Sequence, residues 1–304
     1  MQKVIVTGGA GFIGSNLVDR LVSDKYKVIV IDNESAECNE EFYYNEKAEY
    51  HKLDIEDYDA IEPLFKGVDY VFHLAAESRI QPTLERPVKA CMTNIIGTCN
   101  VLEASRRNGI KRVMYSSTSS AYGLKNSIPL IETMHRDCLN PYSVTKVGAE
   151  DLCKMYYTLY GLECVIFRYF NVYGERQPLK GQYAPVVGLF LEMKKAGKPM
   201  TVVGDGKQTR DYTYVGDVVE ANILASKTNN KDALGEVYNV GTGTNHSVLD
   251  LVKIIEGEHI HLPPRDGEAR DTKADIGKIM LDLDWYPQET IENWISNYKK
   301  EHKI

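Results

Sequence analysis

A glycine-rich turn at residues 7–14, with the sequence TGGAGFIG, joins a short apolar run to an amphipathic segment near the N-terminus. After the turn, apolar residues recur at helical spacing and would pack one helix face against a sheet: Ile13, Leu17, Val18 and Leu21. A strand, a tight turn and a helix in this order begin a right-handed crossover between parallel strands. The turn therefore predicts a sheet with parallel strands and helices packed on it.

Short apolar runs bounded by turn residues alternate with helical segments as far as about residue 170. The later runs are KVIVIDN, AEYHKLDI, YVFHLAA, RVMYSSTSS and CVIFRYFNVYG, and the helical segments include NIIGTCNVLEASRRNG and AEDLCKMYYTLYG. This alternation predicts the α/β class with a doubly wound parallel sheet. After Gly174 the chain becomes rich in Pro, Gly and polar residues, which indicates a smaller C-terminal lobe. The run GEVYNVGTG is expected to return to the sheet as another strand.

Composition limits the partners that the chain can have. With 304 residues, of which 43% are hydrophobic, the chain can form one elaborated domain or two closely packed ones. The formal net charge is −7, which argues against a nucleic-acid partner because binding to phosphates requires an excess of clustered Lys and Arg. Small molecules or a second copy of the chain are the expected partners.

Targeting, redox and metal signals are weak. No apolar stretch has membrane-spanning length, and the N-terminal run lacks the regions of a signal peptide, so we expect a cytoplasmic protein without a membrane partner. Six cysteines lack C-x-x-C spacing and are expected to be reduced thiols: Cys38, Cys91, Cys99, Cys138, Cys153 and Cys164. His259 and His261 have no Cys or carboxylate at ligand spacing, so no metal site is expected.

The glycines of the turn have the context that a phosphate-binding loop needs. Gly8, Gly11 and Gly14 would let the backbone approach a pyrophosphate at the N-terminus of the following helix, although a glycine-rich turn alone is a common feature of α/β proteins. Asp32 ends the second predicted strand, where a carboxylate accepts hydrogen bonds from ribose hydroxyls and repels a 2′-phosphate. NAD is therefore favoured over NADP. Asp54 could flank the adenine or be a solvated strand-end carboxylate.

Tyr142 and Lys146, in the run NPYSVTK, lie four residues apart on a predicted helix and share one face. A cation beside the phenol lowers its pKa from the ordinary value of about 10 and makes it a candidate acid or base. A tyrosine and a lysine at this spacing also occur on ordinary helix surfaces. The glycine-rich turn upstream, which could bind a nucleotide, favours the catalytic interpretation of this pair.

Several motifs in order resemble the extended short-chain dehydrogenase/reductase family: G-x-x-G-x-x-G, HLAA at residues 73–76, Ser116-Ser117-Thr118 and Tyr142-x-x-x-Lys146. Three later runs are similar to nucleotide-sugar epimerases and dehydratases: RYFNVYG, GDGKQTRDYTYVGD and RDGEARDTKAD. The resemblance covers nearly the whole chain. It implies an NAD-binding Rossmann domain at residues 1–170, to which the chain returns at about 212–242. A lobe binding a nucleoside diphosphate sugar would comprise residues 171–211 and 243–304.

The resemblance also implies roles for individual residues. Tyr142 would be the catalytic base, Lys146 would hold the nicotinamide ribose, and Thr118 would hydrogen-bond the reacting oxygen. A strand end rich in Ser and Thr, as at Thr118, can also simply satisfy the backbone of the loop. The expected cofactor-binding residues are Gly8, Gly11, Phe12, Ile13, Gly14, Asp32, Asn33, Asp54, Ile55, Leu74, Ala75, Ala76, Asn94, Ser116, Tyr142, Lys146 and Tyr169. The expected substrate-binding residues are Arg79, Ser119, Ser120, Tyr142, Asn171, Arg210, Arg265, Glu268 and Thr272.

Within that substrate set, Arg210 and Arg265 match the two arginines that clamp the diphosphate, since a guanidinium fork engages phosphate oxygens in a bidentate way. Glu268 matches a carboxylate that binds the nucleotide ribose, and Asn171 a contact to the diphosphate-sugar. Solvated surface charge is the alternative for each of these charged residues. UDP is the expected nucleotide, with GDP and others left open.

The residues that are absent indicate the reaction. Dehydratases of this type carry an Asp-Glu pair directly after the Thr, but Thr118 is followed here by SSAYG, without a carboxylate. The Cys and His of the 3,5-epimerase/reductases are also missing. The remaining outcome is oxidation at carbon 4, rotation of the ketosugar and return of the hydride, which is 4-epimerisation. A reductase or decarboxylase on the same scaffold, and a non-catalytic NAD-binding sensor or scaffold, are the alternatives.

The choice of sugar is expected to depend on Thr272, which stands where a bulky Tyr restricts some epimerases to glucose and galactose. A small residue there leaves room for a 2-acetamido group, so UDP-GlcNAc and UDP-GalNAc are the expected substrates, with UDP-Glc and UDP-Gal also admitted. Arg79 follows HLAA and could reach a sugar carboxylate or a phosphate, which keeps UDP-glucuronate 4-epimerase as an alternative. An arginine at this place is more often a solvated charge or a charge at the rim of a dimer interface. The resemblance further implies a homodimer formed through a four-helix bundle that contains the helix around MYYTLYG.

Overall fold

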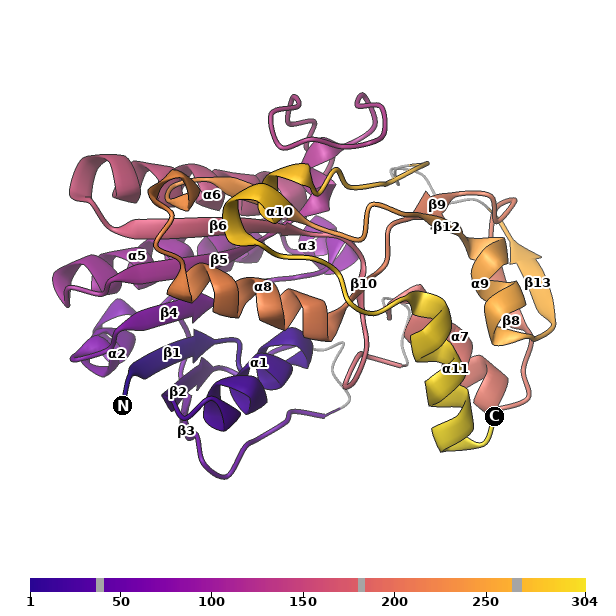
Figure 1. Cartoon of the computed structure of the whole chain (residues 1–304), viewed down its shortest axis with the longest axis horizontal. Helices are drawn as coiled ribbons and strands as arrows, with labels where there is room; N and C mark the ends of the chain where they lie inside the picture. The colour runs from indigo at the N-terminus through magenta and orange to yellow at the C-terminus, as the bar shows by residue number, and fades with distance from the viewer. Residues whose placement is uncertain (37–40, 180–183, 264–269) are drawn as a thin grey trace.

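The computed structural model describes residues 1–36, 41–179, 184–263 and 270–304, and a seven-stranded parallel sheet forms its larger part (Figure 1). The strand order is β11-β6-β5-β4-β1-β2-β3, with all six pairings parallel. The strands are β1 (Lys3–Thr7), β2 (Lys27–Asp32), β3 (Glu49–Lys52), β4 (Tyr70–His73), β5 (Arg112–Thr118), β6 (Glu163–Tyr169) and β11 (Val237–Val240). The direction of winding reverses between β1 and β4, so the predicted doubly wound Rossmann fold is confirmed.

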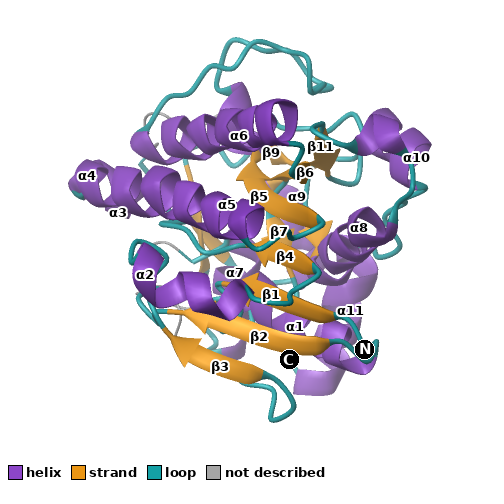
Figure 2. Ribbon diagram, turned by 90° about the vertical axis from the view of Figure 1, so that its left-hand side faces the viewer, coloured by secondary structure: helices purple, strands orange, loops and turns teal. Residues whose placement is uncertain are grey.

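Helices cover both faces of this sheet (Figure 2). One face carries α1 (Phe12–Ser23), α8 (Val215–Lys227) and α10 (Gly277–Leu283), and the other carries α2 (Tyr58–Ile61), α5 (Thr98–Arg107) and α6 (Pro141–Tyr160). Alternating strand residues feed the two cores, as β1 illustrates: Val4 and Val6 belong to the cluster with α1 and α8, whereas Ile5 belongs to the cluster with α5 and α6. This alternation follows from the period of two along a strand.

Short helical pieces complete the α5 side of the sheet. They are α3 (Ile80–Glu85), α4 (Pro87–Cys91), a π-helical stretch (Met92–Gly97) that leads into α5, and a 3₁₀ turn (Glu62–Phe65). Two further 3₁₀ turns lie at Ser119–Tyr122, directly after β5, and at Lys231–Ala233. The first of these turns is important for the site because it redirects the chain at the carboxyl end of a central strand.

A second lobe packs beside the carboxyl ends of the strands, on the right of Figure 1. It contains α7 (Val186–Lys195), α9 (Val248–Ile255), α11 (Ile291–His302) and the parallel pair β8 (Met200–Val203) and β13 (His259–Leu262). Phe190, Leu251 and Ile295 bring these three helices into one apolar core. Two-residue strands form further pairs, β7 (Val172–Tyr173) with β10 (Thr213–Tyr214) and β9 (Thr209–Arg210) with β12 (His246–Ser247).

The buried Asp211 ties crossing segments of the chain together. Its carboxylate accepts hydrogen bonds from the backbone N–H groups of Thr242 (2.7 Å), Gly243 (3.0 Å) and Ala274 (3.0 Å). A buried carboxylate is stable only when such donors satisfy it. Asp211 therefore fixes the segments that carry Arg210 and Thr272 relative to the end of β11.

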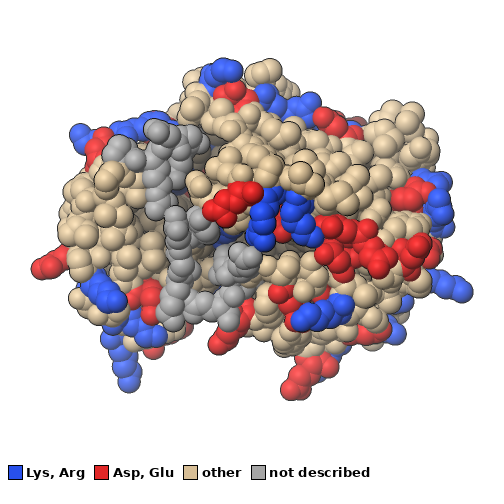
Figure 3. Space-filling view, turned by 180° about the vertical axis from the view of Figure 1, so that it is seen from behind, with Lys and Arg blue, Asp and Glu red and all other residues tan. Residues whose placement is uncertain are grey.

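The surface carries charges of both signs. Figure 3 shows basic and acidic side chains interspersed over one face, without a continuous basic area among the coloured residues. In the part of the chain that is described, no helix is both long and apolar enough to cross a membrane.

Candidate active site

A cleft of about 660 Å³ opens at the carboxyl ends of the sheet strands, where the winding reverses. Ligands of doubly wound sheets bind at this position. The walls come from the turn between β1 and α1, from the ends of β2, β4, β5 and β6, and from the start of α6. Arg210 and Thr272 line the cleft from the opposite side, so the sheet and the second lobe both contribute.

The glycine turn is shaped for close approach of a ligand to the backbone. Gly8 has a φ of +71°, and a Cβ on it would lie 2.7 Å from the Ala75 nitrogen. A Cβ on Gly14 would lie 2.1 Å from the Gly8 oxygen, so α1 can start this close to the strand only with glycine there. Because the turn and the first residues of α1 line the cleft, its unpaired N–H groups can receive a pyrophosphate.

Asp32 lies at the end of β2 and lines the cleft with Asn33. Its carboxylate accepts hydrogen bonds from the N–H groups of Ala10 (3.0 Å) and Glu34 (2.8 Å). Burial raises the pKa of Asp32, and these two hydrogen bonds act in the opposite direction. A carboxylate at this strand end suits a ribose diol and opposes a 2′-phosphate. The residues present therefore fit NAD.

Asp54 and Asn94 are not among the residues that line the cleft. The Asp54 carboxylate accepts a hydrogen bond from Asn33 Nδ2 (2.9 Å) and faces Lys89 Nζ at 3.6 Å. Asn94 is buried, accepts a hydrogen bond from the Glu77 N–H (2.8 Å) and donates one to Thr145 Oγ1 (2.9 Å). Both side chains thus brace the wall from behind, whereas Ile55, also predicted, lines the cleft.

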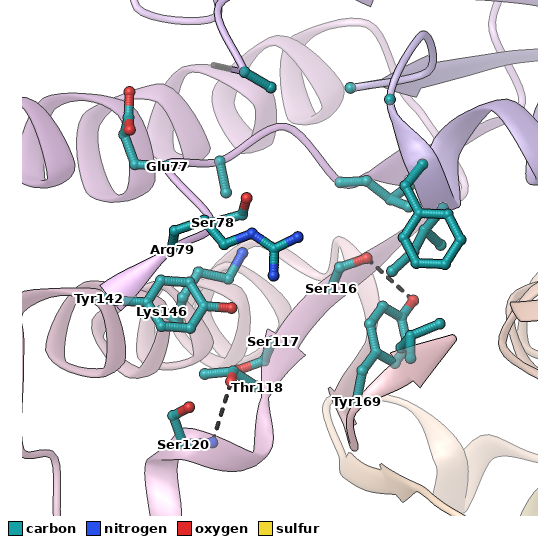
Figure 4. Close-up of a pocket in the computed structure, with 18 of the residues that line it drawn as sticks. Glu77, Ser78, Arg79, Ser116, Ser117, Thr118, Ser120, Tyr142, Lys146 and Tyr169 are labelled. Atoms are coloured by element: carbon teal, nitrogen blue, oxygen red, sulfur yellow. Dashed lines mark hydrogen bonds between the residues drawn. The ribbon is translucent and has the colours of Figure 1, made fainter. Parts of the chain in front are cut away.

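The start of α6 brings the predicted catalytic residues into the cleft. Asn140 caps the helix by accepting a hydrogen bond from the Ser143 N–H (2.9 Å), with Pro141 in the first helical position. Tyr142 and Lys146 then project from one face of α6 into the cleft, which Thr118 at the end of β5 also lines (Figure 4). The helix cap therefore determines where the phenol and the amine lie.

The protonation of this group differs from the sequence-based expectation. Burial raises the pKa of the Tyr142 phenol, and a hydrogen bond with Thr118 and the charge of Arg79 act to lower it. Burial also lowers the pKa of Lys146 to about 7, with the amine 4.5 Å from the centre of the Tyr115 ring. The expectation that Lys146 lowers the phenol's pKa is thus wrong for the ligand-free chain. The depth of burial outweighs the pairing, and the cation that acts on the phenol is Arg79.

Ser116 and Tyr169 were both predicted to contact the cofactor, and they are joined to each other. Ser116 Oγ donates to the Tyr169 hydroxyl at 3.1 Å, and Asn222 Nδ2 donates to the same hydroxyl at 2.8 Å. Burial raises the pKa of Tyr169 to about 12. Tyr169 is therefore a neutral wall of the cleft, connected through Asn222 to α8.

The predicted substrate-binding residues fall into two groups. Arg79, Ser119, Ser120, Asn171, Arg210 and Thr272 all line the cleft. Arg265 and Glu268 lie outside the described residues. Asn171 Nδ2 donates a hydrogen bond to the backbone carbonyl of Asp211 (2.9 Å). Arg210 Nη1 donates to the backbone carbonyls of Thr209 (2.9 Å) and Arg270 (3.1 Å).

Acid–base groups in the cleft are few. Among the described residues that line it, the carboxylates are Asp32 and Glu77, and there is no His or Cys. Asp32 lies at the end of β2, away from Thr118 at the end of β5, and the Glu77 carboxylate points away from Tyr142 in Figure 4. Tyr142 is thus without a second acid–base partner of the kind that an elimination requires.

His73 is a supporting residue that sequence reasoning missed. Its ring nitrogens lie 2.6 Å from Thr7 Oγ1 and 2.9 Å from Thr98 Oγ1, and Thr7 Oγ1 also accepts a hydrogen bond from the Ala75 N–H (3.2 Å). Complete burial lowers the pKa of His73 to about 3, so the ring is neutral. The HLAA motif contains His73, but the hydroxyl groups that His73 contacts belong to Thr7 and Thr98, which are distant in the sequence. Phe42 and Leu53 also line the cleft and had no sequence signal.

Comparisons with known proteins agree with this geometry. The sequence model of the NAD dependent epimerase/dehydratase family matches residues 4–241. The chain is 39% identical to a putative UDP-glucose 4-epimerase of Methanocaldococcus jannaschii, over 97% of this chain and 98% of that protein.

Solved structures agree as well. A UDP-glucose 4-epimerase of Thermotoga maritima, solved with UDP-glucose, superposes with a TM-score of 0.92 at 36% identity, over 99% of both chains. A UDP-N-acetylglucosamine 4-epimerase of Methanobrevibacter ruminantium, solved with UDP-N-acetylmuramic acid, gives 0.91 at 33% identity, over 98% of this chain and 97% of that one. The predicted family and cofactor are confirmed, and the chain belongs to the NAD dependent epimerase/dehydratase family.

Proposed function

We propose that this chain catalyses the NAD-dependent 4-epimerisation of UDP-sugars. The observation that carries the proposal is the set Tyr142, Lys146 and Thr118 in a cleft whose described lining offers no other acid–base group near them. NAD, when bound, accepts and returns the hydride of carbon 4. The similarity to relatives named 4-epimerases supports the same reaction.

The residues of the chain have distinct tasks in this proposal. Tyr142 acts as the phenolate, which the charge of Arg79 favours. Its Oη removes the proton from the carbon 4 hydroxyl and later returns it, while the Thr118 hydroxyl hydrogen-bonds the same oxygen. Lys146 has a pKa of about 7, so its amine supplies a positive charge below about pH 7. Return of the hydride to the opposite face requires the sugar to turn within the cleft.

The small size of Thr272 supports a 2-acetamido sugar as substrate. Thr272 is buried, lines the cleft, and accepts a hydrogen bond from the Asp211 N–H at 3.3 Å. This hydrogen bond holds the short side chain of Thr272 against the backbone of Asp211. UDP-GlcNAc and UDP-GalNAc fit this arrangement, and UDP-Glc and UDP-Gal, being smaller at carbon 2, are admitted as well.

The test is turnover of UDP-GlcNAc and UDP-Glc by the purified protein, with products identified by NMR. We expect both pairs of epimers to interconvert without net consumption of NAD or NADH, because the hydride returns to the substrate. Steady formation of NADH, or loss of carbon dioxide from a uronate, would contradict the proposal. Thr272→Tyr should retain UDP-Glc turnover and lose that of UDP-GlcNAc, whereas Thr272→Ser should retain both.

The division of the chain into two functional parts is also a proposal. We infer that residues 1–170, with the return at about 212–242, hold the cofactor, and that residues 171–211 and 243–304 hold the UDP-sugar. The division is supported by the presence of Arg210 and Thr272 in the lining of the cleft that the glycine turn also lines.

A further inference from the structure

Arg79 occupies an unusual position in the cleft. It is the residue that precedes α3, and its side chain extends into the cleft beside Tyr142 and Lys146 (Figure 4). The Glu77 N–H is held by Asn94, so the loop that carries Arg79 is fixed to the π-helical stretch behind it. A loop fixed by this hydrogen bond thus holds the Arg79 guanidinium at the end of the cleft that contains Tyr142.

The guanidinium lacks a partner within the described part of the chain. Arg79 Nε is buried and makes no hydrogen bond, and no ion pair there involves this side chain. Five N–H donors on a planar fork match a carboxylate in a bidentate way, and a buried donor left unpaired is costly. A hydrogen-bond acceptor supplied by a ligand would satisfy it.

The charges around Arg79 also favour an incoming anion. Arg79 and Lys146 both line this end of the cleft, and the carboxylates of the described lining are Asp32, at the end of β2, and Glu77. The Glu77 side chain points away from the guanidinium in Figure 4. The Arg79 guanidinium therefore has no carboxylate beside it in this part of the lining.

The geometry of a hexopyranose identifies which group of the substrate this is. Carbon 1, which carries the diphosphate, and carbon 4 lie on opposite sides of the ring. When the carbon 4 oxygen is at Tyr142, the diphosphate therefore points away from Arg79, toward the lobe that carries Arg210. Carbon 6 is attached next to carbon 4, through carbon 5, so a charged group there remains close to Tyr142.

We propose that Arg79 is a specificity residue that binds a carboxylate at carbon 6 of the sugar. UDP-linked hexuronic acids, including 2-acetamido forms that Thr272 leaves room for, are then preferred over the corresponding neutral sugars. This inference rests on the proposed function, since it assumes that carbon 4 reacts at Tyr142. The guanidinium fork and its unpaired Nε–H are what a carboxylate would engage.

The experiment compares UDP-N-acetylglucosaminuronic acid with UDP-GlcNAc, in binding by calorimetry and in kcat/KM for epimerisation. Wild type should favour the acid. Arg79→Gln should lower binding and kcat/KM for the acid by about 10- to 100-fold more than those for UDP-GlcNAc, the usual effect of losing a hydrogen bond to a charged group. The loss of the charge beside the Tyr142 phenol affects the turnover of both sugars alike. Arg79→Lys should retain part of the preference. Arg136→Gln, which removes an exposed arginine paired with Asp151, is the matched control.

Three results would overturn the inference. Wild type could show no preference for the acid, or Arg79→Gln could leave the preference intact. Equal losses for both sugars, with a shifted pH profile of kcat/KM, would mean that Arg79 acts only through the Tyr142 phenol. If UDP-GlcNAc is epimerised and the acid is not bound, the inference fails while the proposed function stands. If the acid binds through Arg79 and neither sugar is epimerised, the proposed function fails.

Discussion

Burial moves the titration of Tyr142 and Lys146 toward their neutral forms, because it raises the pKa of the phenol and lowers that of the amine to about 7. A cleft closed on one side by the sheet and on the other by α6 thus sets the charge of both groups. Thr118 and Arg79 act on the phenol in the opposite sense. The activity of the pair therefore depends on neighbours that lie far from it in the sequence.

Replacing Tyr142 with Phe removes only the hydroxyl that exchanges a proton with the sugar. We expect turnover to fall by about 10²- to 10⁴-fold, the usual contribution of general acid–base catalysis, with NAD binding retained. Steady-state kinetics and NAD titration measure the two effects. A variant with full activity would favour the alternative of a non-catalytic NAD-binding protein.

Lys146→Met should change the pH dependence of stability in cofactor-free protein. The folded pKa of about 7 lies below the ordinary 10.5, so between these values the unfolded chain holds a proton that the folded chain lacks, and stability rises with pH. Below about pH 7 the folded chain carries the full cost of the buried charge. The variant should therefore gain most in unfolding free energy at pH 6 and less at pH 9, as measured by urea denaturation.

Lys154→Met, an exposed change on the same helix, is the control and should show no such dependence on pH. An equal effect of Lys146→Met at both pH values would mean that Lys146 titrates normally in the folded chain.

At the scale of elements, the unit β1–turn–α1 illustrates how far sequence reasoning reaches. The apolar period of α1, the glycines and Asp32 are local signals, and each predicted element formed. The braces behind them were not predictable, because His73 meets Thr98, and Asn94 meets Thr145, only after the chain has folded. For the same reason the sequence revealed Tyr142 and Lys146 but not the depth at which they are buried.

Gly14→Ala tests the close contact at the start of α1. A Cβ there would lie 2.1 Å from a backbone oxygen, so the helix must shift, at an expected cost of about 1–3 kcal/mol. The shift should also weaken NAD binding, since α1 begins at the phosphate turn. Thermal unfolding and NAD titration measure both effects. Ser23→Ala, at the exposed end of the same helix, should change neither; unchanged NAD binding by Gly14→Ala would argue against this site for the pyrophosphate.

At the scale of the whole molecule, exposed apolar residues form a stripe along α3, α4 and the π-helical stretch. Its residues recur every four positions and all are exposed, Val88 by 74%: Leu84, Val88, Met92 and Ile96. Val144 and Leu159 are exposed on the neighbouring α6. Apolar patches of this kind mark interfaces between proteins. The expectation of a homodimer through a four-helix bundle stays a prediction, and this surface is where we place it.

Val88→Asp should shift the protein from dimer to monomer, because a charge would be buried in the interface. Sedimentation velocity measures the assembly state, and Leu281→Asp, which alters an 84% exposed leucine on α10, is the control. A wild-type protein that sediments as a monomer at micromolar concentration would contradict the expected bundle.

The site is assembled from two sides, since Tyr142, Lys146 and Thr118 come from the sheet side while Arg210 and Thr272 come from segments fastened by Asp211. Substitutions that alter the second set leave the proton-transfer residues in place. Descendants of one ancestral gene could therefore acquire new sugars by a few changes on one wall, without passing through an inactive intermediate. Relatives named for glucose and for N-acetylglucosamine, which share this fold at 33–36% identity, are what such a history would leave.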